Sequence, residues 1–169
     1  MDQSIPASAV AALPSLLRGA LRRYGYQERD GTVVLCWDHA RFNNHSCRPA
    51  CRTVGDFDIA VRDIPRGGEL TIEYGVINVF DTLECSCGEP ACRRVIRPSD
   101  VERFGDRWDS EVANAARRSA GVDQPLASLF ARGSVGERML ASARDDREPQ
   151  LPRARELVLQ SADPSLRSG

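Results

Sequence analysis

Lysine is absent from this sequence, and all 23 basic residues among its 169 positions are arginine. No side-chain amine of the chain can therefore act as a nucleophile or form a Schiff base. An excess of one charge is absent as well, because 24 acidic residues leave a net charge of −1. Without a strongly positive field we expect neither nucleic acid nor an anionic membrane as a partner. Abundant arginine and alanine without lysine are typical of a GC-rich bacterial genome.

Long apolar runs are also missing. The longest candidate near the start, residues 33–37, is far shorter than the ~18 apolar residues of a membrane span. The first residues lack the basic region and the long apolar region of a secretory signal. We therefore expect a cytoplasmic protein, in which thiols stay reduced. The length corresponds to one domain with a modest core.

Local patterns predict a mixture of helix and strand. Apolar residues at helical intervals predict a short helix at about 14–23. A β-branched and aromatic run predicts a strand over 32–37. Residues 57–61 and 70–74 alternate between apolar and polar side chains, which is typical of half-buried strands. A Pro-Arg-Gly-Gly turn separates these two segments and predicts a β-hairpin-like unit.

The C-terminal part is predicted to be helical from Pro98. Ser99 and Glu102 have the spacing of a capping box. Further helical spacing occurs at Leu126, Leu129 and Phe130. The stretch after Asp145 is charged, interrupted by proline and expected to fray or be disordered. We divide the chain into an N-terminal helical segment (1–23), a core (24–80), a cysteine-rich segment (81–97) and a helical tail (98–169).

Three cysteines lie within eight residues, at Cys85, Cys87 and Cys92. The glycine and proline between them favour a tight loop, and this spacing is typical of a metal knuckle. Structural zinc takes four ligands, so a fourth must come from elsewhere in the chain. The candidates are Cys36, Cys47 and Cys51. Cys47 lies in a turn-prone stretch, whereas Cys36 lies inside a predicted strand.

Three motifs occur in order along the chain: RFNNHSCRP at residues 41–49, GELTIEYG at 68–75, and a Cys-x-Cys-Gly segment ending in Cys-Arg at 85–93. Together they resemble the C-terminal half of a SET domain followed by its cysteine-rich post-SET segment. Enzymes of that family transfer a methyl group from S-adenosylmethionine to the side-chain amine of lysine. The resemblance covers about residues 24–97. It implies an α+β, mostly β SET-like fold with knot-like threading.

The resemblance also assigns roles to residues. It implies that Asn44 and His45 contact S-adenosylmethionine, and that the hydroxyl of Tyr74 helps to align the methyl group with the amine. Position and aromatic character alone make three residues candidates for a substrate channel. These residues are Tyr24, Tyr26 and Phe80. One structural zinc is implied. Its ligands would be Cys47, Cys85, Cys87 and Cys92.

The sequence departs from the family pattern in four places. Only about 23 residues precede Tyr24, and they contain no Gly-x-Gly. Most of the N-terminal half of the fold is therefore expected to be missing, through a start assigned too far downstream, a fragment or a reduced descendant. S-adenosylmethionine is expected to bind weakly or not at all for the same reason. Ala50 replaces an asparagine of the family, Asn43 an apolar residue and Arg94 a glycine.

These observations predict a methyltransferase that acts on lysine in a protein substrate. An alternative of a different class is a non-catalytic, zinc-stapled SET-like binding module. A third possibility is methylation of a small amine.

Overall fold

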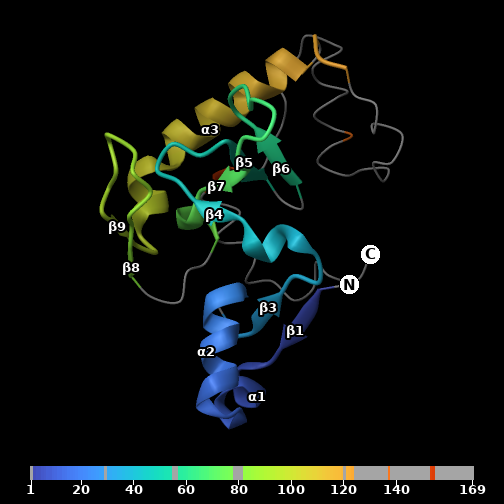
Figure 1. Ribbon diagram of the computed structural model, residues 1–169, viewed down its shortest axis with the longest axis vertical. Coiled ribbons are helices and arrows are strands. Elements are labelled where there is room, and N and C mark those ends of the chain that lie inside the picture. The colour runs from blue at the N-terminus through green and yellow to red at the C-terminus, as the bar shows by residue number, and fades with distance from the viewer. Residues whose placement is uncertain are drawn as a thin grey trace.

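The computed structural model describes residues 2–28, 30–54, 57–77, 82–119, 121–123, 137 and 153–154. These residues form several small sheets and three helices of different lengths rather than a barrel (Figure 1). Helices α1 and α2 lie at one end of the molecule, and the long helix α3 crosses the other end. Within the described residues, no helix has the length and apolarity required to cross a membrane.

The N-terminal unit combines two helices with a three-stranded antiparallel sheet of order β1-β3-β2. Its elements are β1 (Gln3–Ile5), α1 (Ala7–Ala12), α2 (Ser15–Tyr24), β2 (Tyr26–Gln27) and β3 (Val33–Leu35). Pro6 and Pro14 stand immediately before α1 and α2, where a missing N–H does no harm. The helix predicted at 14–23 is confirmed as α2, and the strand predicted over 32–37 is confirmed as the shorter β3.

Strand β1 was not among the elements predicted for residues 1–23. It pairs with β3, with Gln3 opposite Leu35 and Ile5 opposite Val33. Three residues are too few to show a strand periodicity, and the partner strand is distant in the sequence. The local pattern therefore contained no signal for this strand.

The central part of the chain contains two separate strand pairs. Strands β5 (Cys51–Val54) and β6 (Phe57–Ala60) form an antiparallel hairpin. Strands β4 (Asn44–His45) and β7 (Thr71–Ile72) pair in parallel. The predicted hairpin between 57–61 and 70–74 is therefore wrong. The turn between them exists, since Gly68 N donates to Pro65 O at 2.8 Å, but it connects strands of different sheets.

The cysteine-rich segment lies between two short strands that pair with each other, β8 (Leu83–Glu84) and β9 (Val95–Ile96). Helix α3 (Asp100–Ser119) follows and confirms the helix predicted after Pro98. The predicted helical spacing from Leu126 to Phe130, the stretch after Asp145 and Phe80 lie outside the described residues.

Helix α3 covers the central strands with one apolar face. Val112 and Ala116 pack against Val54 of β5, and Val101 and Trp108 pack against Val76. Val76 belongs to the short 3-10 helix η2 (Tyr74–Val76). A Cβ atom on Gly75 would lie 2.8 Å from Cη2 of Trp108, so only glycine permits this close packing. The helix thus lies directly behind the segment that carries Tyr74.

Candidate functional site

The parallel pairing of β4 with β7 brings two sequence motifs together. His45 lies opposite Ile72, and Ser46 N donates to Ile72 O at 3.2 Å. Tyr74 N donates to Nδ1 of His45 at 3.1 Å, although the two residues are 29 positions apart. Their rings lie 5.4 Å apart between centroids. Two short strands are therefore sufficient to place the Asn44-His45 motif beside Tyr74.

The hydroxyl of Tyr74 is held in one position. It donates a hydrogen bond to the backbone oxygen of Asn43 at 2.7 Å. The side chain is half-buried, and burial together with the nearby carboxylate of Glu69 raises the pKa of Tyr74 above its usual value. The hydroxyl therefore stays protonated at neutral pH, with its oxygen lone pairs available to a further donor.

His45 is a neutral imidazole in this environment. Burial, together with the positive charges of Arg93 and Arg52, lowers the pKa of His45 to about 4. Because Nδ1 accepts the hydrogen bond from Tyr74 N, the ring proton lies on Nε2, which is 3.4 Å from Sγ of Cys47. His45 thus contacts both the tyrosine and the cysteine cluster.

Asn44 is the exposed member of this group. Its side-chain amide donates to Oε1 of Glu69 at 2.6 Å. The neighbouring Asn43 supplies the carbonyl that accepts the hydrogen bond of the Tyr74 hydroxyl, so Asn44 directly follows a residue that contacts Tyr74. This polar edge can offer hydrogen bonds to a ligand bound next to Tyr74.

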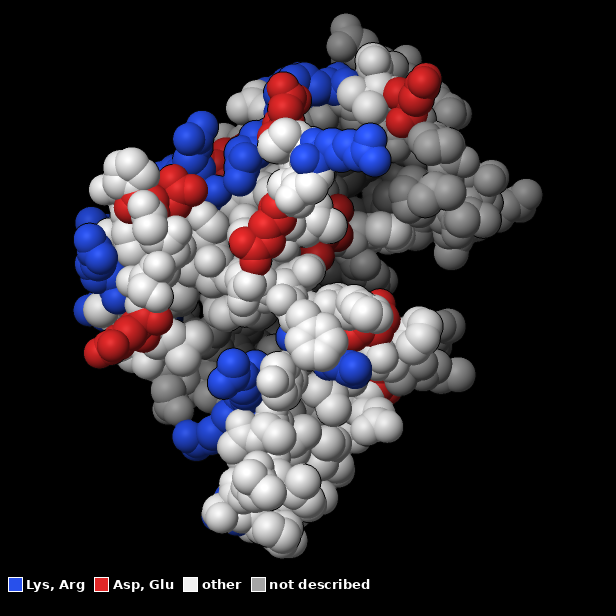
Figure 2. All heavy atoms as spheres, in the orientation of Figure 1, with Lys and Arg blue, Asp and Glu red and all other residues white. Residues whose placement is uncertain are grey.

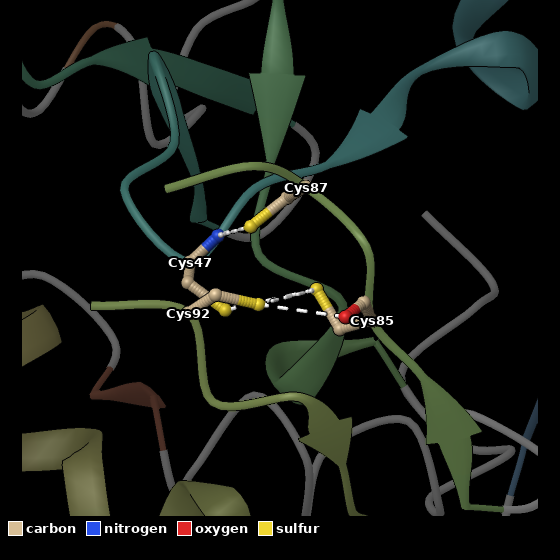
Figure 3. A group of neighbouring side chains, drawn as sticks. All are labelled: Cys47, Cys85, Cys87 and Cys92. Atoms are coloured by element: carbon tan, nitrogen blue, oxygen red, sulfur yellow. Dashed lines mark hydrogen bonds between the residues drawn. The ribbon is translucent and has the colours of Figure 1, made fainter. Parts of the chain in front are cut away.

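Four cysteine sulfurs converge beside this edge (Figure 3). They come from Cys47, Cys85, Cys87 and Cys92, and they all lie within 4.8 Å of one another. The Sγ of Cys85 is 3.8 Å from that of Cys47 and 3.6 Å from that of Cys92. A tetrahedral zinc with bonds of about 2.3 Å needs sulfurs about 3.8 Å apart. The residues present therefore fit a zinc ion.

Backbone N–H groups surround the cluster. Cys47 N donates to Sγ of Cys87 at 3.5 Å, and Arg93 N donates to Sγ of Cys47 at 3.3 Å. Burial alone would raise the pKa of Cys87, but the N–H groups of Cys47 and Glu89 lower it to about 7. Such donors favour the thiolate form that binds metal.

The other two cysteines lie elsewhere. Cys51 is buried beside Ala50 and Ile72 in the core, and burial raises its pKa. Cys36 lies just after β3, and its pKa is also raised by burial. Among the three candidates for the fourth ligand, the structure thus places Cys47 next to the cysteine trio.

Two of the three predicted substrate-channel residues, Tyr24 and Tyr26, lie in the N-terminal unit. Tyr24 ends α2 and packs edge-on against Phe42, with ring centroids 5.6 Å apart. Tyr26 is half-buried in β2 opposite Val34. Phe80 lies outside the described residues. The assignment of these aromatic residues to a channel stays a prediction.

A buried charge network behind Tyr74 was not predicted. Glu73 is 1% exposed, and its carboxylate pairs with Arg52 from β5 and with Arg93 from the cysteine-rich segment. Arg93 also binds Asp100 at 2.8 Å, and Nε of Arg52 donates to Glu111 at 2.8 Å. The alternation over 70–74 indicated that Glu73 faces solvent. In fact Thr71, Ile72 and Glu73 are all buried, whereas Leu70 is 54% exposed.

Comparison with known proteins finds one family model and several relatives that are similar to this chain. The SET domain family model matches residues 18–75. The H3 lysine-36 specific histone-lysine N-methyltransferase of Schizosaccharomyces pombe is 30% identical and covers 75% of this chain. The histone-lysine N-methyltransferase ASHH2 of Arabidopsis thaliana is 31% identical and covers 70% of it. The chain spans 20% of the first relative and 7% of the second.

Proposed function

This chain belongs to the SET-domain family, and from that premise we propose that it transfers a methyl group from S-adenosylmethionine to the side-chain amine of lysine in a protein. The convergence of Tyr74, His45 and the backbone carbonyl of Asn43, at the point where β4 pairs with β7, is the observation that carries the proposal. Two relatives are named as histone-lysine methyltransferases, which favours lysine in a protein over a small amine.

The chain's residues would act mainly by alignment. When bound, S-adenosylmethionine would supply the sulfonium methyl group for transfer to the lysine nitrogen and would leave as a thioether, while the surplus amine proton passes to water. The hydroxyl of Tyr74 donates a hydrogen bond to Asn43 O, so the lone pairs of its oxygen are free to accept an N–H of the lysine. This contact would direct the nitrogen lone pair toward the methyl group.

The lysine must be neutral to attack. A free lysine amine has a pKa of about 10.4, and both burial and a neighbouring sulfonium charge favour the neutral form. Tyr74 is half-buried and pairs with a backbone carbonyl rather than with a carboxylate. An uncharged hydroxyl at this place orients the amine without favouring its protonated form.

The finer features of the fold belong to the same proposal. We propose that Cys47, Cys85, Cys87 and Cys92 hold one structural zinc, which the sulfur distances support. We also propose that the segment carrying Tyr74 passes through the loop formed by the segment before it, an arrangement that is otherwise rare. The parallel pairing of β4 with β7 supports this threading.

The test is methyl transfer from labelled S-adenosylmethionine to a lysine-containing protein or peptide, with calorimetry of cofactor binding. Tyr74→Phe should reduce transfer by roughly a hundredfold, the usual effect of losing one oriented polar group at a reacting centre. Trp37→Phe, at an exposed position after β3, is the matched control and should leave transfer unchanged. Zinc content should be one ion per chain in all three proteins.

Equal transfer by the wild type and Tyr74→Phe would contradict the assigned role of the tyrosine. Absence of transfer and of cofactor binding, with one zinc retained, would favour the zinc-stapled binding module instead. Transfer to free lysine but not to lysine in a peptide would identify a small-amine enzyme.

A further inference from the structure

Arg93 connects the cysteine cluster to the buried charges behind Tyr74. It directly follows Cys92, and its backbone N–H donates to Sγ of Cys47 at 3.3 Å. Its guanidinium donates to Oε1 of Glu73 and, at 2.8 Å, to Oδ2 of Asp100. One residue is thus fixed to the cluster by its backbone and to two buried carboxylates by its side chain.

Glu73 connects Arg93 to the backbone on either side of Tyr74. The same Oε1 atom that binds Arg93 accepts the N–H of Gly75 at 2.8 Å, which caps the short helix η2. Oε1 also lies 3.6 Å from Nδ1 of His45. Because Tyr74 lies between Glu73 and Gly75, the orientation of this carboxylate determines the backbone from which the tyrosine ring projects.

Arg52 binds the same carboxylate but does not link it to the cluster. It reaches Oε2 of Glu73 at 3.5 Å and forms its closer contacts with Glu111 of α3. Both guanidiniums lie over Trp108, at 5.2 Å for Arg52 and 5.8 Å for Arg93. The two arginines therefore resemble each other in charge and packing and differ in their connection to the cysteines.

Arg93 borders a cavity. A cavity of about 300 Å³ lies between the cysteine loop and α3, with Cys47, Pro90, Arg93 and Trp108 among its lining residues. Among the described residues, Nε of Arg93 is a buried side-chain atom without a hydrogen-bond acceptor. One terminal nitrogen of the side chain thus binds Glu73 and the other binds Asp100, and the cavity leaves space beside the guanidinium.

We propose that Arg93 is a positioning residue, which transmits the geometry of the metal-loaded cysteine cluster through Glu73 to Tyr74. The proposal rests on the proposed function for its catalytic consequence, but the coupling itself is a property of the fold. It assigns to the cluster the role of setting the position of the reactive hydroxyl, in addition to stabilising the fold.

The test uses the full chain with fluorinated tyrosine and compares its zinc and cadmium forms. Cadmium is a larger ion that also binds thiolates, so it changes the size of the cluster without emptying it. The chain has three tyrosines, and Tyr74→Phe identifies the signal of Tyr74. In the wild type, the fluorine signal of Tyr74 should shift between the two metals, and the signal of Tyr26 should not.

Arg93→Met should keep one metal ion per chain and reduce the metal-dependent shift of Tyr74 to less than half of its wild-type size, because only the contact of His45 with Cys47 and Tyr74 then remains. Arg52→Met is the matched control, because it removes the other guanidinium from Glu73 and Trp108, and it should keep the shift. A wild-type shift in Arg93→Met, or its loss in Arg52→Met as well, would overturn the proposal.

If Arg93→Met does not fold, Arg93→Lys serves in its place. It keeps a charge but not the fork to two carboxylates, and its shift should fall by about half; an unchanged shift would overturn the proposal.

Activity provides an independent second readout. Arg93→Met should lower kcat roughly tenfold to a hundredfold while KM for the peptide changes less than about twofold, because alignment rather than binding is lost. A rise in KM with kcat unchanged would overturn the proposal. If the wild type transfers no methyl group, the proposed function fails, whereas the fluorine measurement still decides the coupling.

Discussion

The N-terminal unit, residues 2–35, and the part of the chain from β4 to α3 are stabilised in different ways. The first relies on a backbone ladder of three strands and on three buried apolar residues, Leu21, Val33 and Val34. Its helix α2 leaves Leu16 82% exposed. The second buries charges in pairs and gathers four cysteines.

The surface reflects the same difference (Figure 2). Arginine and acidic side chains alternate over α3 and the neighbouring cysteine loop, whereas the surface over α1 and α2 is mostly neutral. Helix α2 carries only positive charges, at Arg18, Arg22 and Arg23. In the N-terminal unit, the loss of one contact should reduce stability only by the contribution of that contact. In the other part, the loss of one partner leaves buried charges, or the remaining thiols of the cysteine cluster, without a partner.

The largest expected effect is loss of the metal site. Cys85→Ser should abolish zinc binding and accelerate amide hydrogen exchange across β4, β7, β8 and β9, because structural zinc contributes folding free energy directly. Exchange in β1 and β3 should change least. Cys36→Ser, outside the cluster, is the control and should retain one zinc. Equal acceleration in both parts would show that they are not energetically distinct.

The second effect concerns the buried carboxylate. Glu73→Gln leaves Arg52 and Arg93 without their shared counter-charge and should lower the free energy of unfolding by about 3–5 kcal/mol. Glu69→Gln, on the exposed side of the same strand region, should cost less than about 1 kcal/mol. Denaturant titration of both variants gives the comparison. A cost for Glu73→Gln no larger than for Glu69→Gln would contradict the role of the network.

A core substitution in the N-terminal unit should have a smaller effect. Leu21→Ala removes a buried side chain of α2 and should lower the free energy of unfolding by about 2–3 kcal/mol. Leu16→Ala on the same helix is the control, and its cost should be within about 0.5 kcal/mol of zero. Zinc content, measured in parallel, should stay at one ion per chain. Loss of zinc in Leu21→Ala would show that the two parts are coupled.

The smallest expected effect is an increase in stability. Arg94 has a φ of 63°, a conformation that side chains other than glycine disfavour, and it directly follows the Cys-Arg pair of the cysteine loop. Arg94→Gly should raise the free energy of unfolding by about 1 kcal/mol. Thermal unfolding of the zinc-loaded protein measures this gain. A lower melting temperature would mean that the arginine side chain contributes contacts that outweigh the strain.

Sequence patterns were informative where a feature is local. Helix α2, the start of α3 and the spacing of Cys85, Cys87 and Cys92 all depend on neighbouring residues. Local patterns made Cys47 one of three candidates for the fourth ligand, and only the family resemblance singled it out and placed His45 near Tyr74, because these contacts join distant segments. The substitution of glycine by Arg94, visible in the sequence, corresponds to a left-handed backbone in the structure.

Features that depend on two buried faces were not predictable. A strand with one solvent-facing side alternates, but Thr71 and Ile72 of β7 are both buried, and so is Glu73 directly after the strand, so the polar character of Glu73 wrongly indicated exposure. Strand β7 has two residues and pairs with an equally short strand distant in the sequence, which leaves no periodic signal. The partners of Glu73 are two arginines among 23, and nothing in the sequence distinguishes them.

The uneven spacing of the four cysteines has a kinetic consequence. Cys85 and Cys92 are only seven residues apart, whereas Cys47 lies 38 residues before Cys85. The short loop can therefore capture a thiophilic ion in the unfolded chain, before any long-range contact exists. Closing the long loop costs about 4 kcal/mol of chain entropy, and the last thiolate must compensate for it. The rate at which β4 meets β7 should thus depend on the concentration of free ion, whereas the rate of assembly of β1 with β3 should not.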